Sequence, residues 1–260
     1  MEEKFLNKHK YNKNIIKQPK YTSYLFKDTN MEDLVAVYFD GKNFKTIPIN
    51  YLINNPIIYD KYYDKNTVSD ITITLCPYTL TGLIYFGKYK LTTYVYNSNI
   101  ILKYNNEDDD LIDDKKRIIQ LSGNIYLKDS LEILNEIIRR EEIKIMTLKK
   151  SLIMFPDSLY LKNTNQQIQI VPKTYYNNNK ILFNINKSPK FNQYEPKLLI
   201  TGIEYISDNK KYTVIISKKK NIETYLEENY EKIKEKYGII VNCFWFAWIS
   251  MYPNSKVIII

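Results

Sequence analysis

Apolar and polar positions alternate along much of the chain, and this alternation predicts strands. Two apolar runs, 34–39 and 44–49, flank Asp40-Gly41. Both turn residues tolerate positive φ, so this segment predicts a β-hairpin. Shorter apolar or alternating runs predict further strands over 71–75, 83–87, 90–96, 100–102, 166–171, 180–185, 198–205 and 211–217, the last two joined at 207–209.

Two segments show helical spacing. Asp129 and Glu132 resemble a capping box, and the apolar residues at 131, 134, 137 and 138 follow the helical period. Asn221 begins a second pattern that ends at Gly238, with glutamates in its first turns and lysines toward its end. This order complements the helix dipole, so both segments are predicted to be helices.

A third helix is predicted near the end of the sequence. Both tryptophans of the chain, Trp245 and Trp248, lie three positions apart, which places them on one face of a short helix. A turn at Pro253 stops that helix. We expect both rings to pack into the core rather than to line a site.

These elements predict an α+β protein that is β-rich, with mostly antiparallel sheet and a few intercalated helices. Residues 1–30 are polar and basic with little periodicity, so they are expected to form a flexible N-terminal arm before a single domain over 31–260. Met154–Ser158 resembles Met251–Ser255, and the strand-turn-strand near residue 40 resembles the one near 208. An old internal duplication and common turn chemistry explain this similarity equally well.

Composition changes how the charge is interpreted. The net charge is +9, but only 3 of the 38 basic residues are arginine, and Lys, Asn, Ile and Tyr dominate. Those residues are typical of an A/T-rich genome, such as that of a large DNA virus or a protist. The same bias accounts for the 25 tyrosines, which otherwise suit partner surfaces or base stacking. Weak, salt-sensitive nucleic-acid binding stays an alternative to codon bias.

The sequence also bears on compartment. No run reaches the roughly eighteen apolar residues of a membrane span, and the charged start lacks the apolar centre of a secretory signal. We therefore expect an intracellular protein that is not secreted, in a host cytoplasm or virion if it is viral. In a reducing compartment, Cys76 and Cys243 are expected as thiols.

Few side chains suit metal or acid–base chemistry. The one histidine, His9, lies in the predicted arm, so a zinc site or a Ser-His-Asp triad has no histidine cluster to use. The six glycines form no phosphate-binding loop. The run Glu107–Asp114 holds six carboxylates but lacks the glycine of a calcium loop. No cofactor or metal is expected.

Four segments, in order, resemble one prokaryotic family, domain of unknown function 3179. A Cys-Pro-x-Cys segment after a strand corresponds to Cys76-Pro77-Tyr78-Thr79. The family's Tyr-Asn-Ser-Asn and Gln-Leu-Thr-Gly segments are similar to 96–99 and 120–123. Its closing aromatic segment and Tyr-Pro-Asp-Thr turn resemble 244–248 and 252–255. The residues that carry the resemblance are Cys76, Pro77, Tyr96, Asn97, Ser98, Asn99, Gln120, Gly123, Trp245, Trp248 and Pro253.

The departures from that family bear on function. Its second cysteine is Thr79 here, and a threonine cannot resolve a mixed disulfide. The resemblance therefore implies a non-enzymatic structural or interaction protein with an unknown protein partner. One alternative is a thiol-dependent redox protein, in which the Thr79 hydroxyl lowers the pKa of Cys76. Another is a nonspecific polyanion binder that uses lysines such as 218–220.

Overall fold

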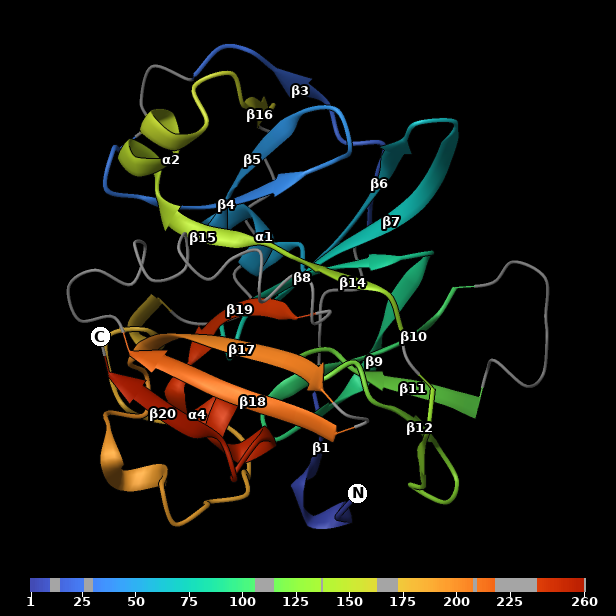
Figure 1. Cartoon of the computed structure of the whole chain (residues 1–260), viewed down its shortest axis with the longest axis vertical. Coiled ribbons are helices and arrows are strands. Elements are labelled where there is room, and N and C mark those ends of the chain that lie inside the picture. The colour runs from blue at the N-terminus through green and yellow to red at the C-terminus, as the bar shows by residue number, and fades with distance from the viewer. Residues whose placement is uncertain are drawn as a thin grey trace.

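Four β-sheets and a few short helices make up the protein (Figure 1). The computed structural model describes residues 1–9, 15–25, 30–105, 115–136, 138–162, 173–207, 210–217 and 238–259, with 205–207 and 210–217 described by their backbone alone. Most strand pairs are antiparallel, as predicted, so the fold is a β-rich α+β fold. The described helices are α1 (Ile49–Asn54), α2 (Leu148–Met154), α4 (Trp245–Met251) and the 3-10 turns η1 (Glu3–Phe5), η3 (Lys173–Tyr175) and η4 (Phe191–Gln193).

The two central sheets are built from the predicted strand-rich block. Sheet A has the order β1 (Leu6–Lys8), β9 (Tyr89–Tyr96), β10 (Asn99–Tyr104), β11 (Lys116–Ile119), β12 (Ile125–Leu127) and β13 (Ile133–Leu134). Sheet B has the order β14 (Arg140–Glu142), β8 (Thr81–Phe86), β7 (Thr67–Cys76), β6 (Ile57–Asp64) and β2 (Ile15–Lys17). Because β7 to β10 are consecutive, the chain passes directly from one sheet to the other.

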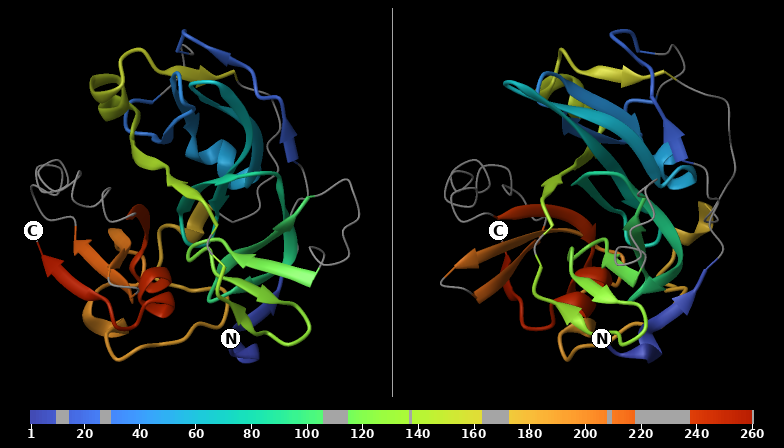
Figure 2. Two further views of the ribbon diagram at one scale, coloured as in Figure 1. Left: turned by 45° about the vertical axis from the view of Figure 1, so that its right-hand side comes forward. Right: turned by 90° about the vertical axis from the view of Figure 1, so that its right-hand side faces the viewer.

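Two further sheets lie beside these, sheet C at the top of Figure 1 and sheet D at its lower left (Figures 1 and 2), and they meet where the N–H of Ile145 in sheet C donates to Asn242 Oδ1 in sheet D. Sheet C has the order β15 (Lys144–Thr147), β4 (Leu34–Phe39), β5 (Phe44–Pro48), β16 (Leu159–Leu161) and β3 (Tyr21–Thr22). Sheet D has the order β19 (Ile239–Phe244), β17 (Leu199–Ser207), β18 (Lys210–Ser217) and β20 (Lys256–Ile259). The largest cluster of buried apolar side chains draws residues from all four sheets.

Sheets C and D repeat one arrangement. In each, a hairpin is flanked by a strand, a seven-residue helix and a second strand: β15-α2-β16 beside β4-β5, and β19-α4-β20 beside β17-β18. The first flanking strand pairs antiparallel and the last pairs parallel in both sheets. The strand registers also match. Ile145 of β15 lies opposite Ala36 of β4, three residues before α2 begins, and Asn242 of β19 lies opposite Thr201 of β17, three residues before α4 begins. That the repeat records a gene duplication stays a hypothesis.

The two copies fill their interiors differently. Trp248, which is fully buried, occupies the helix position that Ser151 holds in the first copy. The strand position facing it is Gly202, whose counterpart in register is Val37. A Cβ at Gly202 would overlap the six-membered ring of Trp248. The glycine therefore makes room for the indole, and both tryptophans lie in the core as predicted.

The predicted hairpin at Asp40-Gly41 is confirmed as β4–β5. Asp40 Oδ1 accepts hydrogen bonds from the backbone N–H groups of Lys42 and Asn43 at 2.8 and 2.7 Å. Gly41 has φ +93°, and a Cβ there would collide with the backbone of Tyr63 in β6. Only glycine meets both conditions. The predicted strands near 71–75, 83–87, 90–96, 100–102, 198–205 and 211–217 are likewise present.

The helix predicted from Asp129 is wrong. The segment forms β13, which pairs with β12, and then β14, which pairs with β8. Leu131 has φ +57°, which no α-helix accommodates. A ten-residue helix is marginal alone, whereas β13 and β14 each gain a hydrogen-bonded partner strand. Tertiary pairing therefore overrides the local helical period.

Two other predictions differ from the structure, and four lie outside the described residues. The range 180–185 is irregular rather than a strand, because its backbone bonds to side chains of the 97–98 turn instead of to a sheet edge. The described part of 1–30 is not a loose arm, since it carries β1, β2 and β3, each paired with a sheet. The helix at 221–237, the strand at 166–171, the acidic run 107–114 and Lys218–Lys220 lie outside the described residues.

The Gly202–Trp248 contact gives a first prediction. Gly202→Ala will lower the free energy of unfolding by about 2–4 kcal/mol, because overpacking a filled core forces neighbours to move. Urea unfolding followed by tryptophan fluorescence measures this. Combining Gly202→Ala with Trp248→Leu, which removes the overlapping ring, will cost less than the sum of the two single changes. Strict additivity of the two effects would contradict the proposed overlap.

Candidate functional site

The segments that carry the family resemblance meet in the interior, between sheets A and B. Cys76 ends β7, and Gln120 follows β11. Asn97 and Ser98 form the turn between β9 and β10, with φ values of 49° and 64°. Both positive φ values suit a tight hairpin of the kind that Asn favours. These residues and Asn99 are at most 2% exposed, so the motifs build an internal cluster.

Gln120 is the centre of this cluster. Its Nε2 donates to Thr74 Oγ1 and to the backbone oxygen of Thr81, both at 3.0 Å. Its Oε1 accepts from Asn99 Nδ2 at 3.0 Å. Both amide hydrogens and the acceptor are therefore used, as a fully buried amide requires. The amide connects β7, β8 and β10.

Asn99 continues the network toward Thr79. Asn99 Nδ2 donates to Thr79 Oγ1 at 3.1 Å, and Asn99 Oδ1 accepts from the backbone N–H of Leu121 at 2.7 Å. Thr79 Oγ1 also lies 2.8 Å from Thr81 Oγ1. Thr79, the residue at the position of the family's second cysteine, is thus part of a closed hydrogen-bonded core.

Cys76 lies inside the same cluster and has no exposed surface. Its Sγ donates to the backbone oxygen of Ser98 at 3.6 Å. Burial raises the pKa of the Cys76 thiol, and a hydrogen bond from Thr79 opposes this rise without cancelling it. Cys243 is also a buried free thiol whose pKa is raised by burial and by the nearby Cys76. The prediction of two thiols is confirmed.

A layer of aromatic side chains covers the Cys76 segment. Tyr175 OH donates to the backbone oxygen of Tyr78 at 2.9 Å, and Tyr176 OH donates to that of Pro77. Burial, and secondarily the nearby Cys76, raises the pKa of both phenols above the ordinary value. Lys197 lies 3.3 Å from the centre of the Tyr175 ring, and burial lowers its pKa to about 8. Sequence patterns gave no signal for Lys197.

His9 belongs to this covering layer rather than to a free arm. Its Nε2 is hydrogen-bonded to Tyr78 OH, and its ring packs edge-on against Tyr78 and Phe183. Burial lowers the pKa of His9 to about 4. Placing the single histidine beside the Cys76 segment needed β1 to pair with β9, which the sequence did not indicate.

The closing aromatic motif joins the cluster through its backbone. The N–H of Phe244 donates to the oxygen of Thr79 at 2.9 Å, and Asn97 Nδ2 donates to the oxygen of Ser250 at 3.3 Å. Trp248 Nε1 donates to Ser255 Oγ at 3.1 Å, next to the turn at Pro253. Thus α4 is attached to the motif turns at both of its ends.

A buried ion pair, missed by sequence reasoning, lies against the Gln-Leu-Ser-Gly turn. Arg140 Nη2 bonds Glu204 Oε1 at 2.6 Å, and Arg140 Nη1 donates to the oxygen of Leu121 at 2.7 Å. Tyr252 OH donates to the other oxygen of Glu204. A Cβ at Gly123, which has φ +67°, would lie 2.5 Å from Arg140 Nε. The motif glycine therefore allows the guanidinium to approach the turn.

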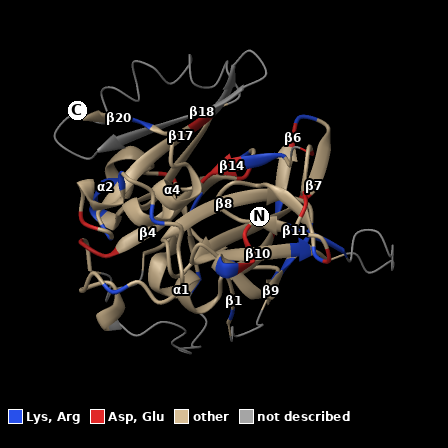
Figure 3. Cartoon of the chain, turned by 90° about the horizontal axis from the view of Figure 1, so that it is seen from below, with Lys and Arg blue, Asp and Glu red and all other residues tan. Residues whose placement is uncertain are grey.

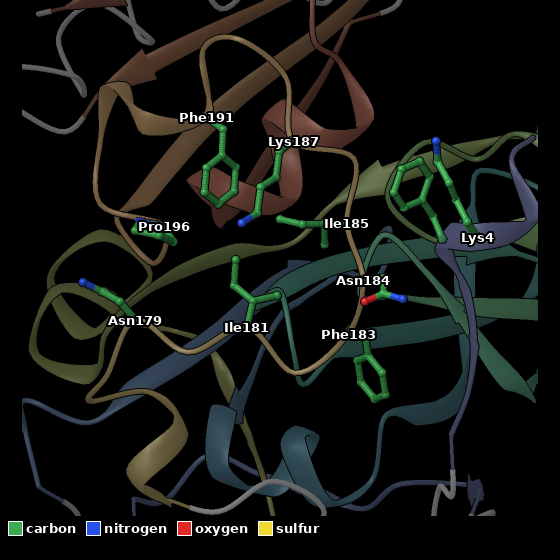
Figure 4. A pocket seen from close by; sticks show the side chains of 10 residues that line it. Lys4, Asn179, Ile181, Phe183, Asn184, Ile185, Lys187, Phe191 and Pro196 are labelled. Carbon is green, nitrogen blue, oxygen red and sulfur yellow. The ribbon is translucent and has the colours of Figure 1, made fainter.

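A cavity of about 600 Å³ lies on the outer side of this region (Figure 4). Figure 4 shows Ile181, Ile185 and Phe191 on its apolar side, with the Lys187 ammonium beside the Phe191 ring. It is formed by the irregular segment 179–196 and by Lys4 and Phe5 of the N-terminal segment. Cys76 does not line it. The motif cluster is thus closed toward this cavity.

Within the described ranges, no three histidine, cysteine or acidic side chains lie close enough together to hold a metal ion. No helix in those ranges is long and apolar enough to cross a membrane.

Comparison with known proteins gives no match: no family model, no curated protein and no solved structure is similar enough to be assigned. The resemblance to domain of unknown function 3179 thus stays a prediction that depends on the motif residues themselves.

The network around Gln120 gives a second prediction. Gln120→Leu removes the bonds that its amide makes with Thr74, Thr81 and Asn99, although Thr74 Oγ1 still donates to Leu83 and Asn99 Nδ2 still donates to Thr79. We expect the free energy of unfolding to fall by about 3 kcal/mol or more, since each stranded buried group costs about 1–3 kcal/mol. Urea unfolding measures the loss. Gln193→Leu, at an exposed position in η4, is the matched control and will change stability by about 0.5 kcal/mol or less. Equal effects of the two changes would contradict the network's importance.

His9 gives a third prediction, about pH. The folded state holds this imidazole neutral down to about pH 4, whereas the unfolded chain protonates it near its ordinary pKa of about 6.5. Stability from His9 is therefore complete above about pH 6.5 and is lost as the pH falls toward 4. His9→Gln will weaken the pH dependence of the urea midpoint between pH 7 and 5. An NMR titration of the single histidine ring that gave a pKa near 6.5 in the folded protein would refute this account.

Proposed function

We propose that this chain is a non-enzymatic structural or interaction protein of the family it resembles, acting by binding rather than by turnover. The observation that carries the proposal is that the polar side-chain atoms of these motif residues are hydrogen-bonded within the fold. The side chains of Asn99, Gln120 and Thr79 form hydrogen bonds with one another and with neighbouring backbone groups. A site that binds a substrate needs polar groups that converge on an open cavity, and these do not.

The thiol alternative has less support from the surroundings of Cys76. A reactive thiol is partly exposed and has a lowered pKa, because the thiolate is the nucleophile. Cys76 has no exposed surface and its pKa is raised. Tyr175 and Tyr176 lie over the segment that an incoming disulfide would have to reach. Its role is better described as a small apolar residue at the end of a strand.

An interaction role is favoured by apolar side chains left on the surface of the first repeat unit. Phe39 and Phe44 form an exposed cross-strand pair at the end of the β4–β5 hairpin, and Phe44 stacks on Phe155 with ring centres 4.4 Å apart. Ile153 and Met154, next to Phe155, are 75% and 40% exposed. Aromatic and methionine side chains gathered on a surface are typical of protein interfaces. An unknown protein partner fits this face.

The reactivity of Cys76 tests the proposal. We expect iodoacetamide to modify the native protein at least about 100-fold more slowly than the urea-unfolded chain, because the thiol must wait for an opening of the fold. Mass spectrometry of the Cys243→Ser variant assigns the rate to Cys76. Rapid native alkylation, or disulfide turnover that disappears in Cys76→Ser, would overturn the proposal in favour of thiol chemistry.

A further inference from the structure

A lysine and two aspartates meet where the β4–β5 hairpin of sheet C packs on β6 of sheet B. Lys45 Nζ lies 2.8 Å from Asp40 Oδ2 and 2.7 Å from Asp60 Oδ2. The side chains of Lys45, Asp40 and Asp60 are only 8%, 1% and 11% exposed. By contrast, the strands β4 and β8 carry no charged residue (tan in Figure 3). An amine and two carboxyl groups are thus held in contact, almost out of water.

Contacts between the hairpin and β6 keep the three groups together. The Tyr63 N–H of β6 donates to the backbone oxygen of Asp40 at 2.7 Å, which attaches the end of the hairpin to the strand that carries Asp60. Tyr38 of β4 lies opposite Lys45 of β5, and its OH donates to Asp60 Oδ2 at 2.6 Å. The Asp60 carboxyl is therefore oriented by a phenol as well as by the amine.

The Asp40 carboxyl is arranged as an acceptor for nucleophilic attack. Its Oδ1 accepts hydrogen bonds from the backbone N–H groups of Lys42 and Asn43 at 2.8 and 2.7 Å. Two N–H groups aimed at one carboxyl oxygen stabilise the oxyanion that develops when a nucleophile adds to the carbon. The same two donors suit the oxygen of an amide product. Oδ2, on the side of Lys45, is then the oxygen that leaves.

Asp60 is placed to move protons between the amine and the leaving oxygen. Its Oδ2 lies within the hydrogen-bond reach of Lys45 Nζ that a general base needs. Burial favours the neutral amine, but the hydrogen bonds with Asp40 and Asp60 outweigh burial and raise the pKa of Lys45. The resting group is therefore the ammonium. Attack begins from the minority of molecules in which a proton has moved to Asp60, so it is slow compared with folding.

We propose that Lys45 and Asp40 condense into an intramolecular isopeptide bond, with Asp60 as the catalytic base. The neutral Nζ attacks Cγ of Asp40, the bond from Cγ to Oδ2 breaks, and Oδ2 leaves as water. Both protons that the ammonium loses leave with that water, carried by Asp60, so no oxidant, reductant or cofactor takes part. Groups held in contact react as if at about 10⁵–10⁸ M, and exclusion of water slows the reverse hydrolysis.

The position of this bond connects it to the exposed aromatic pair of the hairpin. Asp40 directly follows Phe39, and Lys45 directly follows Phe44. A covalent ring at this point fixes the end of the hairpin that presents both phenyl rings. A surface held in one conformation loses less entropy when it binds a partner. The bond is a single self-modification rather than turnover, so it is compatible with the binding role proposed above and does not depend on it.

Intact mass spectrometry of the full chain tests the proposal. After about one week at 37 °C, the folded protein will weigh one water molecule less than its sequence, whereas chain held in urea will keep its full mass. Trypsin will release peptides 28–42 and 43–61 joined as one branched product, because the modified Lys45 is no longer cleaved. A succinimide at Asp40-Gly41 also loses one water but leaves the two peptides separate, so that result counts against the isopeptide bond.

Three variants assign the roles, followed as a time course after dilution from urea. Lys45→Arg keeps the positive charge but will keep the full mass. Asp60→Asn preserves the size of the side chain and will slow the loss of water by about 100-fold or more, as removal of a general base does. Lys42→Arg changes an exposed lysine of the same turn and is the matched control, which will lose water at the parent's rate. Urea unfolding verifies that each variant is folded.

The parent protein decides the matter even if a variant fails to fold. A parent that keeps its full mass overturns the proposal. A peptide 43–61 closed on itself, which would place the bond at Asp60, overturns the assignment of Asp40 as the acceptor. An unchanged rate in folded Asp60→Asn overturns the role of the base. None of these outcomes depends on Cys76, so the alkylation test of the proposed function stays separate.

Discussion

The side-chain amide of Gln120 is the contact on which the centre of this fold depends. It bonds to Thr74, to the backbone oxygen of Thr81 and to Asn99 at once, and so joins the two central sheets. A buried amide that does not make these bonds loses its hydrogen bonds to water without replacement, which destabilises the folded state. That requirement fixes how β7, β8 and β10 lie against one another. Polar residues that look in sequence like parts of a reactive site are therefore explained by the packing of the interior.

The repeated unit shows how one arrangement of strands tolerates two different cores. The first copy has Val37 and Ser151 where the second has Gly202 and Trp248, so bulk moves from the strand to the helix. In the first copy the chain leaves after the hairpin and builds sheets A and B before it returns through β15. Every strand of the central sheets except β1 and β2 thus lies between the two halves of the first unit.

The most deeply buried cations are paired with carboxylates of the same chain. Inside the fold, Arg140 is held by Glu204, and Lys45 lies between Asp40 and Asp60 at 2.8 and 2.7 Å. These pairs are satisfied within the chain. The two thiols are likewise enclosed, since Cys76 and Cys243 have no exposed surface.

The sequence by itself determined six of the central and C-terminal strands, the Asp40-Gly41 hairpin and the tryptophan helix, because period and turn residues act locally. It also indicated which motif residues belong together, but not that they face inward. Only tertiary structure decided that 133–134 and 140–142 pair as strands, that His9 packs on Tyr78, and that Arg140 reaches Glu204. Each of these depends on residues far apart in sequence, and such contacts leave no periodic signal.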